Sequence, residues 1–93
     1  MTLSETHEAR LKRLKIRAWR RGTKEMDLVL GPYADENLSK MSLAELDALE
    51  ALMDENDQDL MSWIMGQSPA PATHQELLAI LTRFAETRFT KMG

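Results

Sequence analysis

The sequence predicts a small, all-helical protein, folded as a single-domain bundle of five helices. Its 93 residues suffice for one domain with one modest core. Apolar residues recur at helical spacings of three and four, whereas strand-like alternation and hairpin turn signals are missing from the sequence. Hydrophobic residues make up 43% and charged residues 29%, an ordinary globular composition. We therefore expect residues 1–93 to form one helical domain.

The first helix is expected over residues 4–20. Leu11, Leu14 and Ala18 are spaced so that they would line one face of this helix. Gly22 is a natural stop signal, because glycine readily adopts a positive φ just beyond a helix end.

The second helix is expected to start near Thr23 and to be interrupted at Gly31-Pro32. A proline inside a helix removes one backbone hydrogen bond and clashes with the preceding turn. We therefore expect a break there, after which Pro32 can serve as the first residue of a short helical continuation. The apolar stripe of this segment consists of Met26, Val29, Leu30 and Tyr33.

The third helix has the clearest start signal. Ser42 and Glu45 are spaced as a capping box, in which each side chain accepts a hydrogen bond from an amide that the helix leaves unpaired. The helix should end near Asn56. Its expected apolar stripe consists of Leu43, Leu46, Leu49 and Met53.

The fourth helix should be short. Asp57 is a suitable N-cap, Asp59 complements the positive end of the helix dipole, and Gly66 is expected to end the helix. Residues 67–72 contain two prolines and should form an extended connection. The expected inward side chains are Leu60, Trp63 and Ile64.

The fifth helix is expected to begin with a second capping box, formed by Thr73 and Glu76, and to end near Phe89. The last residues of the chain are expected to fray. The inward face should consist of Leu77, Ile80, Leu81, Phe84 and Arg88.

Charge is unevenly distributed along the chain. The net charge is +5 over residues 1–25, −9 over residues 26–66 and +1 over residues 67–93. This polarity bears on association and orientation rather than on the fold. The chain has no cysteine and no apolar run near the roughly 20 residues of a membrane span, which fits a cytosolic protein without membrane insertion.

The sequence offers few groups for catalysis or for cofactor binding. His7 and His74 both fall where helices are expected to start, and we expect neither to have a catalytic or metal role. Residues 54–65 lack the glycine and the terminal glutamate of a calcium loop. The four glycines are isolated, so no phosphate-binding loop is present. We expect no catalytic, cofactor-binding or metal residue and no enzymatic activity.

Residues 20–27 combine a helix end, a glycine hinge and a helix start. This arrangement presents Arg21 and Glu25 on either side of Gly22. The simplest interpretation is a helix-stop glycine with a charge pair near a helix end, which stabilises a fold by a few tenths of a kcal/mol. An interaction site is the alternative.

The spacing Arg21-Gly22-x-x-Glu25 resembles the RGxxE motif of the SdhE family, the succinate dehydrogenase assembly factor 2 proteins. Residues 10–19 resemble the basic first helix of this family, and residues 57–65 resemble its D-x-D-L-x-x-W segment. The order and spacing of these pieces make the resemblance specific over residues 10–72.

Other positions add to this comparison. Asp27 follows the motif as in many bacterial members, and Leu38 with the acidic third helix resembles the central region of the family. Two departures concern Thr23, where many members carry methionine, and Pro32-Tyr33, where many carry an aromatic pair.

The resemblance implies a five-helix assembly factor that binds the flavoprotein subunit of succinate dehydrogenase, and in some bacteria the related subunit of fumarate reductase. It further implies that the factor promotes covalent attachment of FAD to a histidine of this client. FAD would be the cofactor of the client and would not be bound stably by the factor. We expect a bacterial cytoplasmic protein that is a monomer when free. The expected client-binding residues are Arg20, Arg21, Gly22, Glu25 and Asp27.

Each central motif residue has an expected role in client binding. Gly22 would permit close backbone approach, because a Cβ atom there would intrude. The guanidinium of Arg21 would bind a client carboxylate or carbonyl group. Glu25 would accept hydrogen bonds from the client or orient Arg21.

Two other interaction classes remain as alternatives. Small acidic helical proteins also act as antitoxin-like partners of small membrane proteins. The basic first helix could instead bind DNA, but the acidic remainder and a pI near 5.3 argue against a nucleic-acid partner.

Overall fold

Five α-helices and one 3₁₀ helix make up the described chain. The computed structural model describes residues 5–92, with side chains up to residue 87. This part of the chain contains no strand, and the expected all-helical fold is confirmed. The elements are α1 (His7–Trp19), α2 (Lys24–Asn37), η1 (Leu38–Lys40), α3 (Leu43–Met53), α4 (Asp57–Ile64) and α5 (Ala72–Met92).

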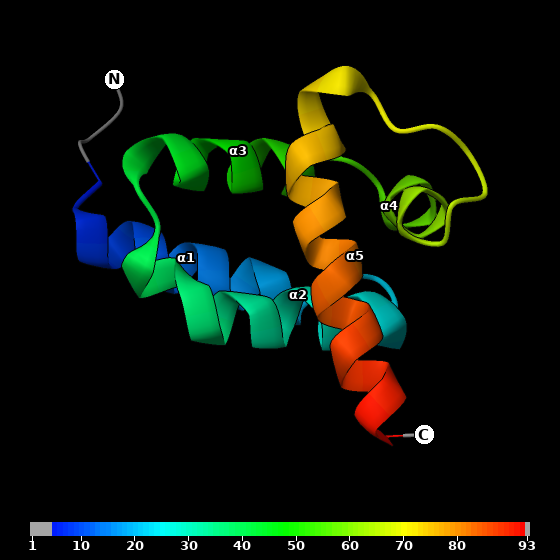
Figure 1. Ribbon diagram of the computed structural model, residues 1–93. Coiled ribbons are helices and arrows are strands. Elements are labelled where there is room, and N and C mark those ends of the chain that lie inside the picture. Colours follow the sequence, from blue (N-terminus) through cyan, green and yellow to red (C-terminus); the bar gives the residue numbers. More distant parts are fainter. Residues whose placement is uncertain (1–4, 93) are drawn as a thin grey trace.

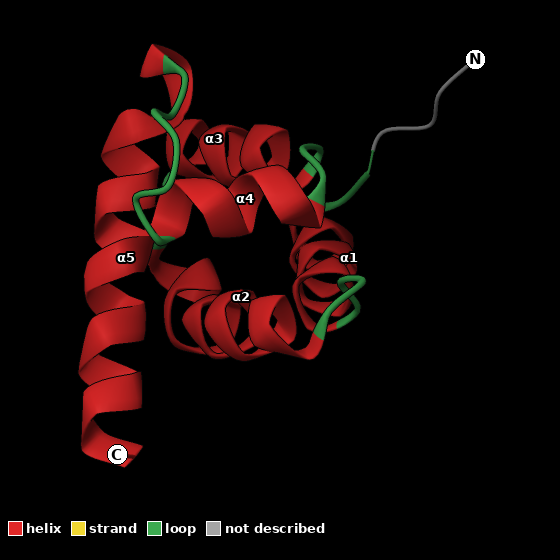
Figure 2. Cartoon of the chain, turned by 90° about the vertical axis from the view of Figure 1, so that its right-hand side faces the viewer, coloured by secondary structure: helices red, strands yellow, loops and turns green. Residues whose placement is uncertain are grey.

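The first three α-helices lie side by side, and α5 crosses them at a steep angle (Figure 1). The view turned by 90° shows α1, α2 and α3 nearly end-on, with α4 lying across the end of this layer beside α5 (Figure 2). The turn between α1 and α2 therefore lies close to α4.

The core lies where the helices converge. Leu14 and Ala18 are buried and Leu11 packs against the core, which confirms the expected inner face of α1. Burial of these aliphatic side chains is the main favourable contribution to folding. The largest fully buried side chains are those of Leu14, Met26, Val29, Leu30, Leu46, Leu49, Leu52, Met53, Leu60 and Leu81.

Most of the local helix signals are confirmed. The Ser42–Glu45 capping box is present, with Ser42 Oγ accepting from the Glu45 amide at 3.1 Å and the Glu45 carboxylate accepting from the Ser42 amide at 2.8 Å. Thr23 caps α2, and Gly66 adopts the expected positive φ of 75°. The expected start of α1 at residue 4 lies outside the described residues.

The expected break at Gly31-Pro32 is wrong, because α2 continues through both residues. Gly31 is buried beneath the Trp19 ring, and a Cβ atom there would lie 2.4 Å from Trp19 Cδ2. The indole Nε1 donates to Asp35 Oδ1 at 3.2 Å, which fastens Trp19 to α2 on the far side of Pro32. Packing along the whole helix thus outweighs the local effect of the proline.

Two expected inward faces need correction. Leu43 in the first turn of α3 is 64% exposed, whereas Leu52 is fully buried. The buried face of α5 runs through His74, Leu78, Leu81 and Ala85, whereas Ile80 is 48% exposed. The α5 helix is therefore rotated relative to the expected face.

The expected boundaries of α5 also differ from the structure. The helix begins at Ala72, directly after Pro71, so Thr73 lies inside the helix and cannot be its N-cap. The helix continues past Phe89 to Met92. The side chain of Arg88 and the final residue lie outside the described part of the chain.

The charge polarity is largely neutralised within the fold. Arg10 pairs with Asp47 at 2.6 Å, and Arg17 pairs with Asp54 at 2.9 Å. Arg13 pairs with Glu50 at 2.7 Å, and these contacts join the basic α1 to the acidic α3. Among residues 5–92, no helix combines the length and apolar character needed to cross a membrane.

Candidate functional site

Residues 20–23 connect α1 to α2 and are called the RG turn below. The turn begins where the Arg20 amide donates to the Arg17 carbonyl at 3.3 Å, closing α1. It ends where the Thr23 hydroxyl accepts from the Met26 amide at 3.2 Å, capping α2. Both ends of the RG turn are therefore fixed by local helix caps.

The Arg21 side chain points into the protein. Its Nε donates to Asp57 Oδ1 at 2.7 Å, its Nη1 to the Met53 carbonyl at 2.7 Å and its Nη2 to the Glu55 carbonyl at 2.8 Å. Only 10% of the side chain is exposed. The Met53 carbonyl lies at the end of α3, where carbonyls lack partners within the helix, and it also accepts from Arg17 Nη2 at 3.2 Å. One guanidinium thus holds the connection between α3 and α4.

Two carboxylates hold the backbone of the RG turn. Asp57 Oδ2 accepts a hydrogen bond from the Gly22 amide, while its Oδ1 accepts from Arg21. On the other side, Asp27 Oδ1 accepts from the Arg21 amide at 2.6 Å. Asp57 was expected to be the N-cap of α4, but Asn56 has that role and leaves the Asp57 carboxylate for the turn.

Gly22 is distinguished by its close approach to α4 rather than by its φ angle. Its φ is not positive, so the expected left-handed helix stop is wrong. A Cβ atom at this position would lie 2.9 Å from Asp57 Oδ2. The close approach expected at Gly22 therefore already occurs within the protein, to the carboxylate of α4.

A buried histidine extends this network to α5. His74 is 6% exposed, and its Nε2 lies 2.9 Å from Glu55 Oε2. The backbone carbonyl of Glu55 is one of the acceptors of Arg21. We expected His74 to be an ordinary helix-start residue. Its spacing of four and seven from Leu78 and Leu81, which are buried, was the signal that it faces inward.

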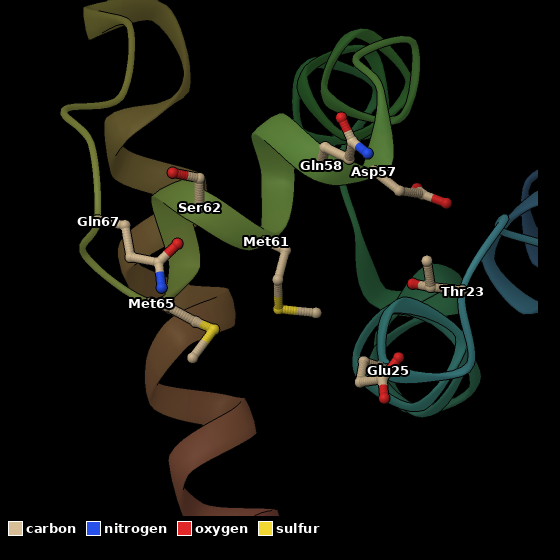
Figure 3. A pocket seen from close by; sticks show the side chains of 8 residues that line it. All are labelled: Thr23, Glu25, Asp57, Gln58, Met61, Ser62, Met65 and Gln67. Atoms are coloured by element: carbon tan, nitrogen blue, oxygen red, sulfur yellow. The ribbon is translucent and has the colours of Figure 1, made fainter.

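An open groove of about 350 Å³ lies beside the RG turn, between the start of α2 and α4. Figure 3 shows the Met61 side chain extending from α4 toward the start of α2, where Thr23 and Glu25 lie. Glu25 is exposed and has no hydrogen-bond or ion-pair partner among the described residues. The lining residues are Thr23, Glu25, Asp57, Gln58, Met61, Ser62, Met65 and Gln67.

The five expected client-binding residues therefore divide into two groups. The Arg21 side chain is largely buried and Asp27 is partly buried, and both are bonded within the protein, whereas Arg20, Gly22 and Glu25 are exposed. Asp57, rather than Glu25, orients the Arg21 side chain. Within residues 5–92, no group of three or more His, Asp or Glu side chains could hold a metal ion.

Sequence reasoning missed the groove and the bridging role of Asp57. Asp57 lies 36 positions from Arg21, and nothing local to either residue reveals the contact. Met61 and Met65 were a possible signal, because methionines four residues apart share one helix face.

Comparison with known proteins points to one family. The family model described as "Flavinator of succinate dehydrogenase" matches residues 12–85. The "FAD assembly factor SdhE" of Acetobacter pasteurianus is 33% identical over 85 residues, which cover 91% of this chain and 76% of that protein. A second "FAD assembly factor SdhE", from Aliivibrio fischeri, is 41% identical over 49 residues, covering 53% of this chain and 57% of that protein.

A fungal relative is longer. "Succinate dehydrogenase assembly factor 2, mitochondrial" of Mycosarcoma maydis is 39% identical over 69 residues, which cover 74% of this chain but 29% of that protein. The family match includes the RG turn, Asp57 and all of α4. The chain therefore belongs to the family of succinate dehydrogenase flavinators, as the RGxxE resemblance predicted.

Proposed function

We propose that this protein promotes covalent attachment of FAD to a histidine of the flavoprotein subunit of succinate dehydrogenase, with the fumarate reductase subunit as a second client. Family membership and the names of the bacterial relatives support this function. The observation that carries it is the construction of the RG turn. Its inner side is bonded to α2, α3 and α4, and its outer side presents Gly22 next to Glu25, which lies in the first turn of α2 beside an open groove.

The protein acts as a non-enzymatic assembly factor in this proposal. The histidine and the FAD both belong to the client, so the factor contributes positioning rather than reacting groups. Holding two reactants in a productive geometry is a major source of rate acceleration. The factor must then bind the reactive conformation of the client more tightly than other conformations.

The geometry divides the motif into positioning and contact residues. Arg21, Asp27 and Asp57 fix the RG turn from within, and a prearranged turn loses less conformational entropy on binding. Gly22 and Glu25 would contact the client directly. Glu25 would accept hydrogen bonds from client donors, since its carboxylate has no partner among the described side chains of residues 5–87. Arg20 is exposed at the same turn and would lie at the edge of the contact.

We also propose that the protein acts in the bacterial cytoplasm and is a monomer before it meets the client. The match to two bacterial FAD assembly factors supports the first statement. The internal pairing of α1 with α3 supports the second, because it satisfies much of the basic charge that could otherwise recruit an acidic second copy.

The test is a flavinylation assay with purified protein, FAD and the apo flavoprotein subunit. The wild-type chain should increase covalent flavin on the subunit, seen as in-gel fluorescence, and Glu25→Lys should abolish the increase because it reverses an exposed charge at the RG turn. Glu86→Lys is the matched control, since Glu86 is exposed on α5, away from the RG turn, and should leave activity unchanged. No increase with the wild-type chain, or equal activity of the two variants, would contradict the proposal.

A further inference from the structure

We propose that the groove between α2 and α4 binds one extended segment of the client, in which a lysine or arginine stands close along the chain to a large apolar side chain. The cation would pair with Glu25, and the apolar side chain would lie on Met61 and Met65. This inference rests on the proposed function and specifies the chemistry of the partner segment.

The floor of the groove is apolar and adaptable. Met61 and Met65 are separated by one helical turn, so both line the same side of α4. Met61 is half-buried against the core, whereas Met65 is 62% exposed. Flexible thioether side chains adjust to the shape of a bound side chain. An apolar side chain placed here would remove Met65 from water.

The rim of the groove is negatively charged. Its two carboxylates are those of Glu25 and Asp57, and no lysine or arginine with a described side chain lines the groove. Asp57 is already neutralised by Arg21 and bonded to the Gly22 amide. Glu25 has no partner among the described residues, so its charge is left for the occupant. Charge complementarity therefore calls for a cation.

The remaining lining residues favour a peptide over a small molecule. Gln58 and Gln67 place two amides at the groove, and an amide can both donate to and accept from peptide groups. The groove is open, and its volume of about 350 Å³ lies near the lower end of ligand pockets. An extended segment crossing the groove can use both the amides and the methionines.

A second groove provides the matched control. It measures about 190 Å³ and lies between α3 and α5, with Ile80 on its wall. Ile80 is 48% exposed, so replacing it introduces a charge at a comparably exposed apolar position remote from Glu25. Two carboxylates line this second groove: Glu45, which is engaged in the capping box of α3, and the exposed Glu76 on α5.

The experiment measures binding of purified variants to the flavoprotein subunit of succinate dehydrogenase. Met65→Lys should weaken binding by about tenfold or more, since burial of a large apolar side chain is lost. Ile80→Lys should bind as the wild type does. Lysine is favourable at the C-terminal end of a helix, so Met65→Lys should fold normally. Wild-type affinity for Met65→Lys would overturn the inference.

The charge and the occupant are tested separately. Glu25→Gln should weaken binding and flatten its dependence on salt concentration, and an unchanged salt dependence would overturn the cation assignment. Photoreactive p-benzoylphenylalanine in place of Met65 should crosslink to a client segment that carries lysine or arginine near a large apolar residue. A crosslinked segment without a cation, or crosslinking from position 80 but not from position 65, would overturn the inference.

The two proposals fail in different ways. If the wild-type chain raises covalent flavin and Met65→Lys does so with unchanged affinity, the groove inference is wrong and the proposed function stands. If the wild-type chain neither binds the subunit nor raises covalent flavin, the proposed function is wrong and the groove inference is overturned with it.

Discussion

Arginines stabilise two neighbouring regions of this protein in different ways. On the α1–α3 face, Arg10, Arg13 and Arg17 pair with carboxylates near the surface, and their partners Asp47 and Asp54 are 72% and 69% exposed at the side chain. Such pairs contribute little individually, because water screens the charges and the long side chains lose entropy.

In the RG turn, a single arginine donates hydrogen bonds to several groups that would otherwise bond to water. Arg21 is 10% exposed and Asp57 14% exposed, and the guanidinium also bonds two backbone carbonyls. Removing one partner from such a cluster leaves buried polar groups unsatisfied, which costs far more than losing a surface pair. The α1–α3 ion pairs therefore each contribute little to the stability of the fold, whereas the Arg21 cluster determines the conformation of the motif.

Arg21→Ala should lower the free energy of unfolding more than any substitution of an arginine on the α1–α3 face. We expect a loss of about 3 kcal/mol in the free energy of unfolding, because Asp57 loses its ion-pair partner, the Glu55 carbonyl loses its donor and the Met53 carbonyl keeps only Arg17. Urea unfolding monitored by circular dichroism measures this loss. A loss no larger than that of Arg13→Ala would remove the distinction between the two regions.

Asp57→Asn should have an intermediate effect. The asparagine amide offers one oxygen for two donors, Arg21 and the Gly22 amide, so one hydrogen bond is lost at a cost of about 1–2 kcal/mol. The matched control is Asp59→Asn in the same first turn of α4, which removes a similar charge at an exposed position. If urea unfolding shows that the two variants lose the same free energy of unfolding, Asp57 acts only through the helix dipole.

Arg13→Ala should have the smallest effect at neutral pH, about 1 kcal/mol or less. Its effect should depend on pH, because the hydrogen bond from Arg13 holds the pKa of Glu50 below its ordinary value of 4.5. A carboxyl with a lowered pKa stabilises the fold above that ordinary value and loses this contribution as pH falls through its folded pKa.

The wild-type chain should therefore lose stability in acid more steeply than Arg13→Ala. Urea unfolding at neutral pH and at several pH values below 4.5 measures the two slopes. If the free energy of unfolding falls equally steeply with pH in both proteins, Arg13 does not lower the pKa of Glu50.

Local signals were predictable from the sequence, and long-range ones were not. The Ser42–Glu45 capping box lies within four consecutive residues, so the sequence alone predicted it correctly. The continuous α2 was missed, because Trp19 packs on Gly31 from another helix and offsets the effect of Pro32.

The site shows the same limit. The RGxxE spacing predicted the location of the motif, and the exposed positions of Gly22 and Glu25 match an interaction surface. The inward direction of Arg21 depends on Asp57, which is 36 positions away and was assigned to a local cap. Family resemblance locates such a motif, but only the fold shows which of its side chains are already engaged.

The central claim is that the outer surface of the RG turn binds the client while its inner surface holds the fold. The most direct measurement is in-gel fluorescence of covalent flavin on the dehydrogenase subunit, after the gene has been deleted in its host. We expect the band to disappear and to return with the wild-type gene but not with Glu25→Lys, whose isolated protein should remain helical by circular dichroism. An unchanged band after deletion, or full restoration by Glu25→Lys, would contradict this account.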